Sequence, residues 1–386
     1  MPDRIFSSVE MIGRLVGFDT TSRASNLALI DFAREYLDRW RVKSELVFDA
    51  SGGKANLFAT IGPADQGGVM LSGHSDVVPV DGQDWTTEPF QLDARDDRLY
   101  GRGSADMKSF IAVMLAKVPE FVAKPLAVPI HFALTYDEEV GCLGVRSLIA
   151  ALAPRAVKPR LCIIGEPTGM QPVTAHKGSR RLRCHVRGHE AHSSLTHKGV
   201  NAIETAAALI VYLKGIARKK RVDGPFDPAF DPPYTTLQTG LVSGGIAVNI
   251  VPRECRFDFE MRHLPADDPD LIVDELKRYA ASLLPEMQAV AETAGIAFEE
   301  TNTVAALAAS EDDEVVQLAI ALSGANGTGK VSFATEGGFF QNAGIPTVIC
   351  GPGSIEQAHK PDEFIARDQV RQCEDFIDRL IERVRR

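Results

Sequence analysis

The sequence has little of several features that mark particular protein classes. Its six cysteines are scattered and form no Cys-x-x-Cys pair, which excludes a disulfide framework or a zinc ribbon and fits reduced thiols. No run approaches the roughly 18 apolar residues of a membrane span. Residues 1–6 begin no apolar signal core. We therefore expect a cytoplasmic protein with no membrane partner.

Positive charge is also scarce. The chain has 42 basic and 52 acidic residues, and its net charge of −10 argues against general binding to nucleic acid or anionic membranes. The basic cluster at residues 218–221 ends a helix-like segment, where cations suit the helix dipole.

Residues 324–330 nearly match the sequence of a phosphate-binding loop. However, Val331 stands where the Mg²⁺-binding hydroxyl belongs, and a helix precedes the loop where a strand is required. We expect neither a nucleic-acid partner nor a nucleotide.

What the sequence does have is the composition of an ordinary globular protein, with 45% hydrophobic and 24% charged residues, over 386 residues. That length exceeds one ordinary core and favours two domains. In the first part of the chain, apolar strand-like runs alternate with helical segments such as 110–118. This alternation predicts an α/β domain whose mostly parallel sheet is flanked by helices. The predicted strands include 42–48, 56–61, 69–71, 128–134 and 160–164.

The pattern changes between residues 179 and 303. There the order of predicted elements is strand, helix, two strands, helix, strand, which describes a small α+β domain of the split-βαβ type. From about Val304 the first pattern resumes. We therefore predict one domain made of residues 1–178 and 304–386, with a second domain, residues 179–303, inserted in it.

Potential metal ligands follow five apolar runs of the first domain. A run into Gly73 is followed by a histidine and a carboxylate two residues apart, and similar groups end the later runs. Ligands collect beyond the carboxyl ends of parallel strands, so we expect these side chains to meet. The five candidates are His74, Asp106, Glu139, Glu166 and His359.

Each candidate taken alone has a simpler structural explanation. Asp106 could cap a helix, Glu166 could cap a turn, and His359 could lie on the surface. Their joint occurrence at strand ends favours a metal site instead. Two imidazoles and three carboxylates suit two ions that share a bridging carboxylate, with Zn²⁺ favoured and Co²⁺ or Mn²⁺ as substitutes. Asp76 and Glu138 are left over to fix a histidine tautomer or to take a proton from water.

Five segments, in this order along the chain, resemble the dinuclear zinc aminoacylase/carboxypeptidase (M20-type) family. The acetylornithine deacetylase branch is the most similar, because of Ala334-Thr335-Glu336-Gly337 and residues 351–359. The family segments are Gly73-His74-Ser75-Asp76-Val77-Val78-Pro79, Gly101-Arg102-Gly103-Ser104-Ala105-Asp106-Met107-Lys108, Asp137-Glu138-Glu139-Val140-Gly141, Gly165-Glu166-Pro167-Thr168 and His359-Lys360-Pro361-Asp362-Glu363.

The resemblance implies a role for each matching residue of the metal site. His74 and Glu166 would bind one zinc ion, and Glu139 and His359 the other. Asp106 would bridge the two ions, with a cis peptide bond to the next residue. The remaining two carboxylates would serve catalysis: Asp76 would steady His74, and Glu138 would be the general base.

The resemblance also implies roles for residues of the inserted domain and for one acidic residue beyond it. His192 matches the histidine that reaches the partner subunit's active site, and the register to Gly199 favours it over His189. Arg262 matches the arginine that binds the substrate carboxylate, and Asn249 matches a substrate-contacting asparagine. For Glu336 our own hypothesis is a contact with a cationic end of the substrate.

Taken together, the resemblance implies a zinc exopeptidase-like catalytic domain and an inserted dimerisation or lid domain in a homodimer. The expected reaction removes the acetyl group from an N-acetylated amino acid, most of all N2-acetyl-L-ornithine in arginine biosynthesis. The alternatives are a succinyl-diaminopimelate desuccinylase, another N-acyl-amino-acid deacylase or a metallodipeptidase. A metal-free binding protein with the same fold is a remote alternative, because every ligand and both auxiliary carboxylates are present.

Overall fold

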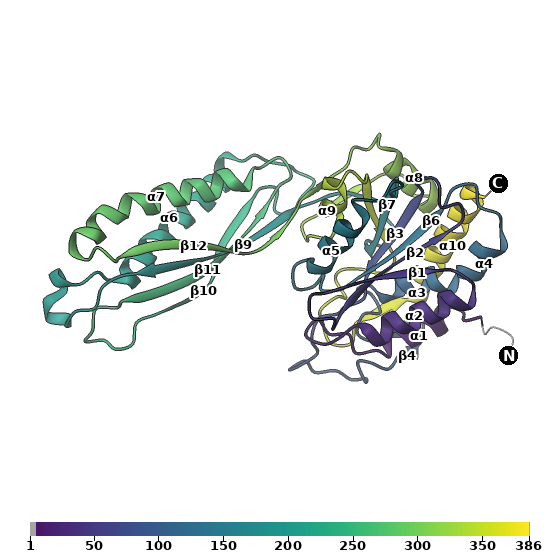
Figure 1. Cartoon of the computed structure of the whole chain (residues 1–386), viewed down its shortest axis with the longest axis horizontal. Helices are drawn as coiled ribbons and strands as arrows, with labels where there is room; N and C mark the ends of the chain where they lie inside the picture. The colour runs from purple at the N-terminus through teal and green to yellow at the C-terminus, as the bar shows by residue number, and fades with distance from the viewer. Residues whose placement is uncertain (1–4, 386) are drawn as a thin grey trace. The chain divides into compact units, whose positions relative to one another are not determined.

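The computed structural model describes residues 5–385, and Figure 1 shows the course of the chain. Residues 1–4, where we looked for a signal sequence, and residue 386 lie outside the described residues. The chain divides into two compact units. The first unit comprises residues up to Ala175, together with Leu307–Lys330 and the residues from Thr335 onward.

The second unit interrupts the first one in sequence. It comprises His176–Ala306 and Val331–Ala334, so the predicted inserted segment, residues 179–303, falls within it. The short stretch Val331–Ala334 was not foreseen as part of it, because sequence separation hides its backbone contact with the region around Asp231. There the Ser332 hydroxyl donates a hydrogen bond to the Asp231 carbonyl.

A nine-stranded sheet forms the centre of the first unit. Its strand order is β1-β2-β6-β3-β7-β15-β8-β13, and β14 pairs with β8. The strands are β1 (Ser44–Phe48), β2 (Ala55–Ile61), β3 (Val69–His74), β6 (Ile130–Thr135), β7 (Leu161–Pro167), β8 (Val173–His176), β13 (Leu307–Ala308), β14 (Gly329–Val331) and β15 (Thr347–Gly351).

The middle of this sheet is parallel and its outer pairs are antiparallel. Strand β6 runs parallel to β3, β3 to β7, and β7 to β15, whereas β1–β2, β2–β6 and β15–β8 are antiparallel. The residues of β3, β6, β7 and β15 are all buried, as expected for strands covered on both faces. Four neighbouring strands therefore present their carboxyl ends at one edge of the sheet.

Helices cover this sheet, and sequence features explain where several of them begin. Ser7 and Glu10 form a reciprocal capping box at the start of α1. In α10, apolar residues recur every three or four positions and face the core. The helices are α1 (Ser8–Val16), α2 (Leu27–Arg39), α3 (Lys108–Ala116), α4 (Val118–Ala123), α5 (Leu143–Leu152), α8 (Glu314–Ser323), α9 (Gly337–Asn342) and α10 (Arg367–Val384).

A small sheet of three strands also belongs to the first unit. Its order is β16-β5-β4, and all its pairs are antiparallel. The strands are β4 (Asp93–Arg95), β5 (Arg98–Tyr100) and β16 (Phe364–Ala366). Strand β5 ends just before the loop of Asp106, and β16 begins just after the loop of His359. Their pairing therefore brings these two loops of the predicted metal site together.

The second unit has the element order predicted for the inserted domain. It runs β9 (Gly178–Arg187), the short helix η1 (Ser193–Lys198), α6 (Ala202–Asp223), β10 (Thr236–Gly244), β11 (Glu254–His263), α7 (Pro269–Val290) and β12 (Gly295–Val304). The four strands form an antiparallel sheet in the order β10-β11-β9-β12. Buried residues alternate along β11, and α6 and α7 cover the buried face, so this unit has its own core.

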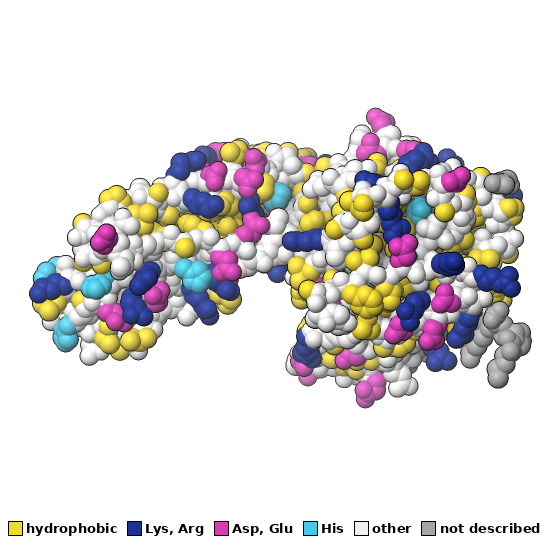
Figure 2. Space-filling model, in the orientation of Figure 1, with side chains coloured by type: hydrophobic (Ala, Val, Ile, Leu, Met, Phe, Trp, Pro, Cys, Tyr) yellow, Lys and Arg dark blue, Asp and Glu magenta, His cyan; other side chains and the backbone are white. Residues whose placement is uncertain are grey.

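The surface and the cysteines agree with the composition. On the face that Figure 2 shows, basic and acidic side chains are interspersed on both units. All six cysteines lie within residues 5–385 and are buried free thiols. Among the described helices, none combines the length and the apolar character that crossing a membrane requires.

Candidate metal centre

The parallel strands bring the predicted ligands of the first unit to one edge of the sheet. His74 is the last residue of β3, Glu166 is near the end of β7, and Glu139 follows β6. Asp106 lies in the turn before α3, and its peptide bond to Met107 is cis, as the resemblance implies. His359 lies in the loop after β15 and is the only one of these side chains that is half exposed, at 52%.

Asp106 lies between the two histidines. Its Oδ1 is 2.9 Å from the Nε2 atom of His74, and its Oδ2 is 3.5 Å from the Nε2 atom of His359. Each oxygen of one buried carboxylate therefore faces a different imidazole. This is the arrangement that a bridging carboxylate between two metal ions needs.

The remaining two carboxylates pair with one histidine each. Glu166 Oε1 is 3.8 Å from His74 Nε2, and Glu139 Oε2 is 3.0 Å from His359 Nε2. Two sets of ligand atoms lie within 4.8 Å of one another and could hold a metal ion: His74 with Asp106 and Glu139, and His74 with Glu138 and Glu166. The nitrogen and oxygen donors suit Zn²⁺ and its substitutes.

The electrostatics of the cluster also fit a bound cation. Burial, followed by repulsion from Asp106, raises the pKa of Glu139 to about 7 and that of Glu166 well above its usual value. Hydrogen bonds to Asp106 and Glu139 raise the pKa of His359 to about 10. Buried carboxylates that repel one another in this way need a compensating positive charge. A divalent ion would supply that charge, so the residues fit the metal that the resemblance implies.

His74 is oriented for binding through its Nε2 atom. Its Nδ1 lies 2.9 Å from the backbone carbonyl of Asp76, and since a carbonyl only accepts, Nδ1 carries the proton. The nearer carboxylate oxygen of Asp76 is 3.6 Å away. A backbone carbonyl that holds the distal nitrogen is a common second contact of metal-binding histidines.

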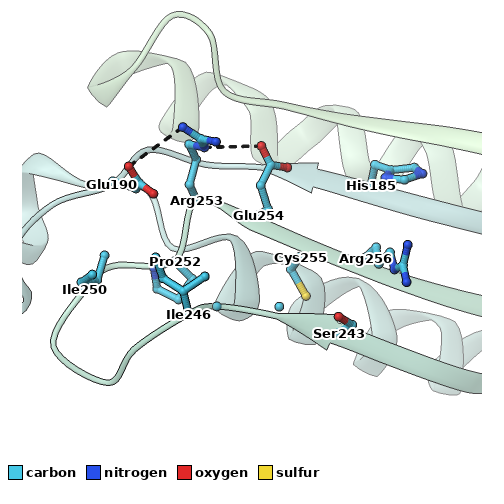
Figure 3. A pocket seen from close by; sticks show the side chains of 12 residues that line it. His185, Glu190, Ser243, Ile246, Ile250, Pro252, Arg253, Glu254, Cys255 and Arg256 are labelled. Atoms are coloured by element: carbon cyan, nitrogen blue, oxygen red, sulfur yellow. Dashed lines mark ion pairs between the residues drawn. The ribbon is translucent and has the colours of Figure 1, made fainter.

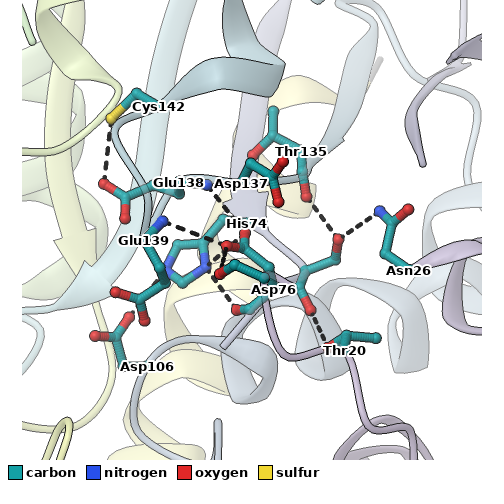
Figure 4. A network of polar contacts seen from close by, with 12 residues as sticks. Thr20, Asn26, His74, Asp76, Asp106, Thr135, Asp137, Glu138, Glu139 and Cys142 are labelled. Carbon is teal, nitrogen blue, oxygen red and sulfur yellow. Dashed lines mark hydrogen bonds and ion pairs between the residues drawn. The ribbon is translucent and has the colours of Figure 1, made fainter. Parts of the chain in front are cut away.

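The carboxylate of Asp76 makes closer contacts elsewhere. It accepts a hydrogen bond from the hydroxyl of Ser22 at 2.6 Å. It also accepts from the backbone N–H groups of Glu138 and Glu139 at 3.1 and 3.3 Å (Figure 4). The Asp76 side chain, which we expected to steady His74, thus holds the loop that carries Glu138 and Glu139, while the Asp76 backbone carbonyl contacts His74. Nothing in the spacing of the motif reveals the contact with this loop.

Glu138 lies beside the ligands with few contacts of its own. The thiol of Cys142 donates a hydrogen bond to its Oε1 at 3.4 Å, as Figure 4 shows. The preceding residue, Asp137, has a left-handed backbone with φ of 54° and pairs with Lys54 at 2.5 Å. Burial raises the pKa of Glu138 well above its usual value. A carboxylate with a raised pKa in a firmly held loop suits proton transfer.

Glu336 is buried near this cluster, with 1% exposed surface. Burial raises the pKa of Glu336 to about 8, although the neighbouring Thr135 side chain lowers it in part. Its Oε1 atom has no hydrogen-bond partner among residues 5–385. A buried acceptor without a partner is costly, so this oxygen would gain from a donor that the described residues do not provide.

His192 and Asn249 lie together at one end of the second unit. Both are exposed, and the loops that carry them are joined by a hydrogen bond from the backbone N–H of Ser193 to the carbonyl of Asn249 and by a bridge between His192 and Ile250. The Nδ1 atom of His192 accepts from the backbone N–H of Ser194 at 3.2 Å, which leaves Nε2 as the donor. His189, the alternative, is also exposed and bridges to Val200.

Arg262 lies at the other end of the same sheet. In the antiparallel pair of β11 and β9, Arg262 stands opposite Ser179, whereas Glu254, near the Asn249 loop, stands opposite Arg187. Eight residues of strand separate the two ends, or about 27 Å at the usual rise. The guanidinium of Arg262 is 3.0 Å from Oε1 of Glu260, which holds it at the half-buried surface.

A pocket lies at the His192 end of the second unit. It is lined mainly by the ends of β10 and β11, and Arg253 pairs there with Glu190 and Glu254 (Figure 3). Its mixed charges and wide opening differ from the closely packed ligands of the first unit. The chemistry of the molecule therefore centres on the first unit, around Asp106.

Sequence reasoning missed several residues that hold the cluster together. Ser22 donates a hydrogen bond to the carboxylate of Asp76, and Lys54 pairs with Asp137, which precedes Glu138. Arg102 and Glu363 form a buried ion pair at 2.7 Å behind Asp106. Arg102 and Glu363 stand inside segments that the resemblance rests on. Burial of both charges is the property that a motif does not show.

Comparison with known proteins identifies the family. The model of peptidase family M20/M25/M40 matches residues 70–383. The chain belongs to this family. It is 35% identical to acetylornithine deacetylase of Proteus mirabilis (strain HI4320) over 369 residues, covering 94% of this chain and 92% of the relative. It is 34% identical to acetylornithine deacetylase of Myxococcus xanthus, covering 99% of this chain and 98% of the relative.

Solved structures of the family share the fold of this M20 hydrolase. The M20 family metallo-carboxypeptidase Sso-CP2 from Sulfolobus solfataricus has a TM-score of 0.74 at 18% identity, covering 98% of this chain and 99% of that one. The YXEP protein of Bacillus subtilis, described as a dinuclear metal binding peptidase, has a TM-score of 0.65 at 14% identity, covering 98% of both chains. These structures show the fold, while the family match and the sequence relatives support a metallo-amidohydrolase.

Proposed function

We propose that this hydrolase removes the acetyl group of N2-acetyl-L-ornithine, giving L-ornithine and acetate, as a step of arginine biosynthesis. The main support for the hydrolytic site is the position of the Asp106 carboxylate, whose two oxygens face His74 and His359. The choice of substrate is supported by the names of relatives that are 33–35% identical over nearly the whole chain. The proposed cofactor is a pair of Zn²⁺ ions, with Co²⁺ or Mn²⁺ as substitutes.

The chain's own residues divide the chemistry between them. His74 and Glu166 would hold one ion, Glu139 and His359 the other, and Asp106 both. Bound divalent ions supply Lewis acidity and lower the pKa of water. Glu138 takes a proton from the attacking water and returns it to the leaving amine, because its carboxylate is held beside the ligands by the loop that Asp76 fixes.

The proposed substrate contacts require two copies of the chain. Arg262 would bind the substrate carboxylate, and His192, with its Nε2 donor, would stabilise the oxyanion, with Asn249 beside it. The 27 Å or so of strand between these groups far exceeds the roughly 10 Å length of one acylated amino acid. Arg262 and His192 can touch one substrate only if they come from different subunits.

A homodimer through the second unit would supply the second copy. Strand β10 is one of the two edge strands of the sheet as described, and it exposes Leu241 and Val242. Helix α6 exposes Val211. An open edge strand with apolar side chains favours pairing with another strand. Light scattering should give twice the chain mass, and Leu241→Lys should lower it; a monomer with full activity would contradict the dimer.

Hydrolysis of N-acetyl-L-ornithine is the direct test of the proposed reaction. We expect release of ornithine with Zn²⁺ or Co²⁺ added, loss of activity after chelation, and recovery when the ion returns. Cleavage of a succinyl or dipeptide substrate at higher kcat/KM would keep the metal chemistry and overturn the proposed substrate.

The six cysteines are buried free thiols, which fit a reducing compartment, and we propose that the protein is cytoplasmic.

Glu336 provides a test of the cationic end of the substrate. We propose that its unpartnered Oε1 accepts a hydrogen bond from the ornithine ammonium. Glu336→Gln should then raise KM for N-acetyl-L-ornithine more than for N-acetyl-L-norvaline, which has the same chain length without the ammonium. An equal change for both substrates would show that this carboxyl group plays no part in recognition.

A further inference from the structure

A carboxylate that does not face the metal ligands lies directly behind them. Glu363 is 1% exposed and accepts four hydrogen bonds, two at each oxygen. Its Oε1 accepts from the backbone N–H groups of Ala105 and Asp106 at 2.8 and 3.0 Å. Its Oε2 accepts from the backbone N–H of Gly103 at 3.1 Å and from Arg102 at 2.7 Å. One side chain thus holds the whole turn that ends in the bridging ligand.

Arg102 carries this contact across to the loop of His359. Its guanidinium is 1% exposed, lies over the ring of Trp85, and donates to Oε1 of Gln83 at 2.6 Å. The amide nitrogen of Gln83 in turn donates to the backbone carbonyl of His359 at 2.9 Å. Glu363, Arg102 and Gln83 therefore form one hydrogen-bonded chain between the backbones of Asp106 and His359.

The two histidines differ in how much support they need. His74 ends a fully buried strand, and its neighbours in β6 fix its backbone. His359 has a left-handed backbone with φ of 63° and a half-exposed side chain in a loop. A ligand on such a loop holds a metal well only if other contacts fix the loop, since ordering it on binding costs free energy.

We propose that Glu363 is a positioning residue that couples the loop of Asp106 to the loop of His359 and so sets the affinity for the divalent ion held by Glu139 and His359. This inference rests on the proposed metal site. Because Glu363 stands four residues after His359, the same segment provides a ligand and the group that fixes the bridging ligand. The ion held by His74 and Glu166, on two strand ends, depends on it less.

Glu363→Gln tests the proposal with almost no change in volume. An amide offers only one oxygen, so its nitrogen would point donor to donor at two N–H groups that now have an acceptor. We expect two dissociation constants for Zn²⁺ from chelator competition on the metal-free wild type. We assign the weaker constant to the site of Glu139 and His359, because His359 lies on a loop. In the variant, the affinity of this weaker site should fall about 10–100-fold, the range for outer-shell partners of metal ligands. The tighter site shares Asp106 but not His359 with this network, so its affinity should fall by a smaller factor.

Gln83→Ala is a second variant that should fold without difficulty, because Gln83 is only half buried. It removes the donor to the His359 carbonyl and should weaken the same site, but less. Asp267→Asn is the matched control, because Asp267 is a buried carboxylate paired with Lys220 at 2.6 Å in the second unit. It should lower stability and leave both Zn²⁺ constants unchanged.

The outcomes separate this inference from the proposed function. Failure of the wild type to bind two Zn²⁺ ions would overturn the proposed dinuclear site itself. The wild type could instead bind two ions, and Glu363→Gln and Gln83→Ala could bind them with unchanged dissociation constants. That result would leave the dinuclear site intact and overturn the role of Glu363. Visible absorption of Co²⁺ gives an independent readout, since a displaced His359 should change the spectrum of the weaker site.

Discussion

The two units hold their candidate functional side chains in opposite ways. In the first unit, four of the five candidate ligands are buried, and the carboxylates of Asp76 and Glu363 fix the backbone around them. In the second unit, His192 and Asn249 are exposed on loops, and Arg262 has a single close carboxylate, Glu260. The first arrangement is preorganised within one chain, whereas the side chains of the second are open to solvent, as the proposed contact with a partner subunit requires.

This difference assigns different jobs to the units. Charges that repel one another in a buried site persist only if the surrounding structure holds them, and they gain most from a bound cation. Exposed donors gain strength only when water is excluded around them. In our proposal the first unit therefore provides the chemistry, and the second provides contacts that form when a substrate and a second copy of the chain are in place.

The largest expected effect comes from the proposed base in the first unit. Glu138→Gln should lower kcat by about 10²–10⁴-fold, the usual contribution of a general acid–base group. The content of metal should stay at two ions, because this residue acts on water and is not required as a ligand. Glu139→Gln is the matched comparison and should lose an ion. Loss of metal from the Glu138 variant would make it a ligand, as its proximity to His74 and Glu166 allows.

The next effect sharpens the contrast between the units. His192→Ala should lower kcat by about 10²–10³-fold, as removal of an oxyanion donor does. Mixing it with Glu138→Gln should restore activity, because one site of each mixed dimer then has both groups. Random reassociation gives half mixed dimers with one working site each, or about a quarter of the wild-type activity. No recovery in demonstrably mixed dimers would place His192 in its own subunit's site.

Chelation should affect the units unequally. Removing the ions leaves Glu139 and Glu166 repelling Asp106. Relative to a solution whose free ion concentration is about 1,000 times the dissociation constant, the first unit should lose about 4 kcal/mol of stability for each ion removed. Amide exchange at the ends of β3 and β7 should become faster, and exchange in β9 and β11 should not change. Equal acceleration in both sheets would show that the second unit depends on the metal as well.

How far the sequence predicts this molecule depends on the kind of residue. The order of elements in the second unit and the meeting of His74, Glu139 and Glu166 followed from apolar patterns and strand ends, which are local. The strand-end prediction was wrong for Asp106, which lies in the turn before α3, and for His359, which lies in a loop after β15.

Helix α3 was expected to begin at Phe110, but it begins at Lys108, a buried lysine that donates to the Phe18 carbonyl. Glu363 was missed for the same reason: a charge satisfied by distant backbone groups looks like a surface residue in the sequence.

The sequence also failed to predict three short strands. Strands β4, β5 and β16 have three residues each, too few for a periodic pattern, yet they join the loop of Asp106 to the loop of His359. The fold of a motif can thus be predicted from its residues, while the contacts that fix it come from pairings that are remote in sequence.

The smallest expected effect is in the first unit, away from the metal, and separates core electrostatics from the metal site. His131 in β6 contacts the Thr60 hydroxyl at 2.9 Å and stacks on Phe58, and burial followed by repulsion from Arg155 lowers its pKa to about 4. The unfolded chain binds the proton near pH 6.5, so stability should fall as pH drops from about 6.5 towards 4, by roughly 3 kcal/mol. His131→Gln should flatten this part of the unfolding curve measured by urea titration at each pH with the ions present. An unchanged slope would mean that the acid sensitivity of the first unit comes from release of the metal, and that its core tolerates a charged His131.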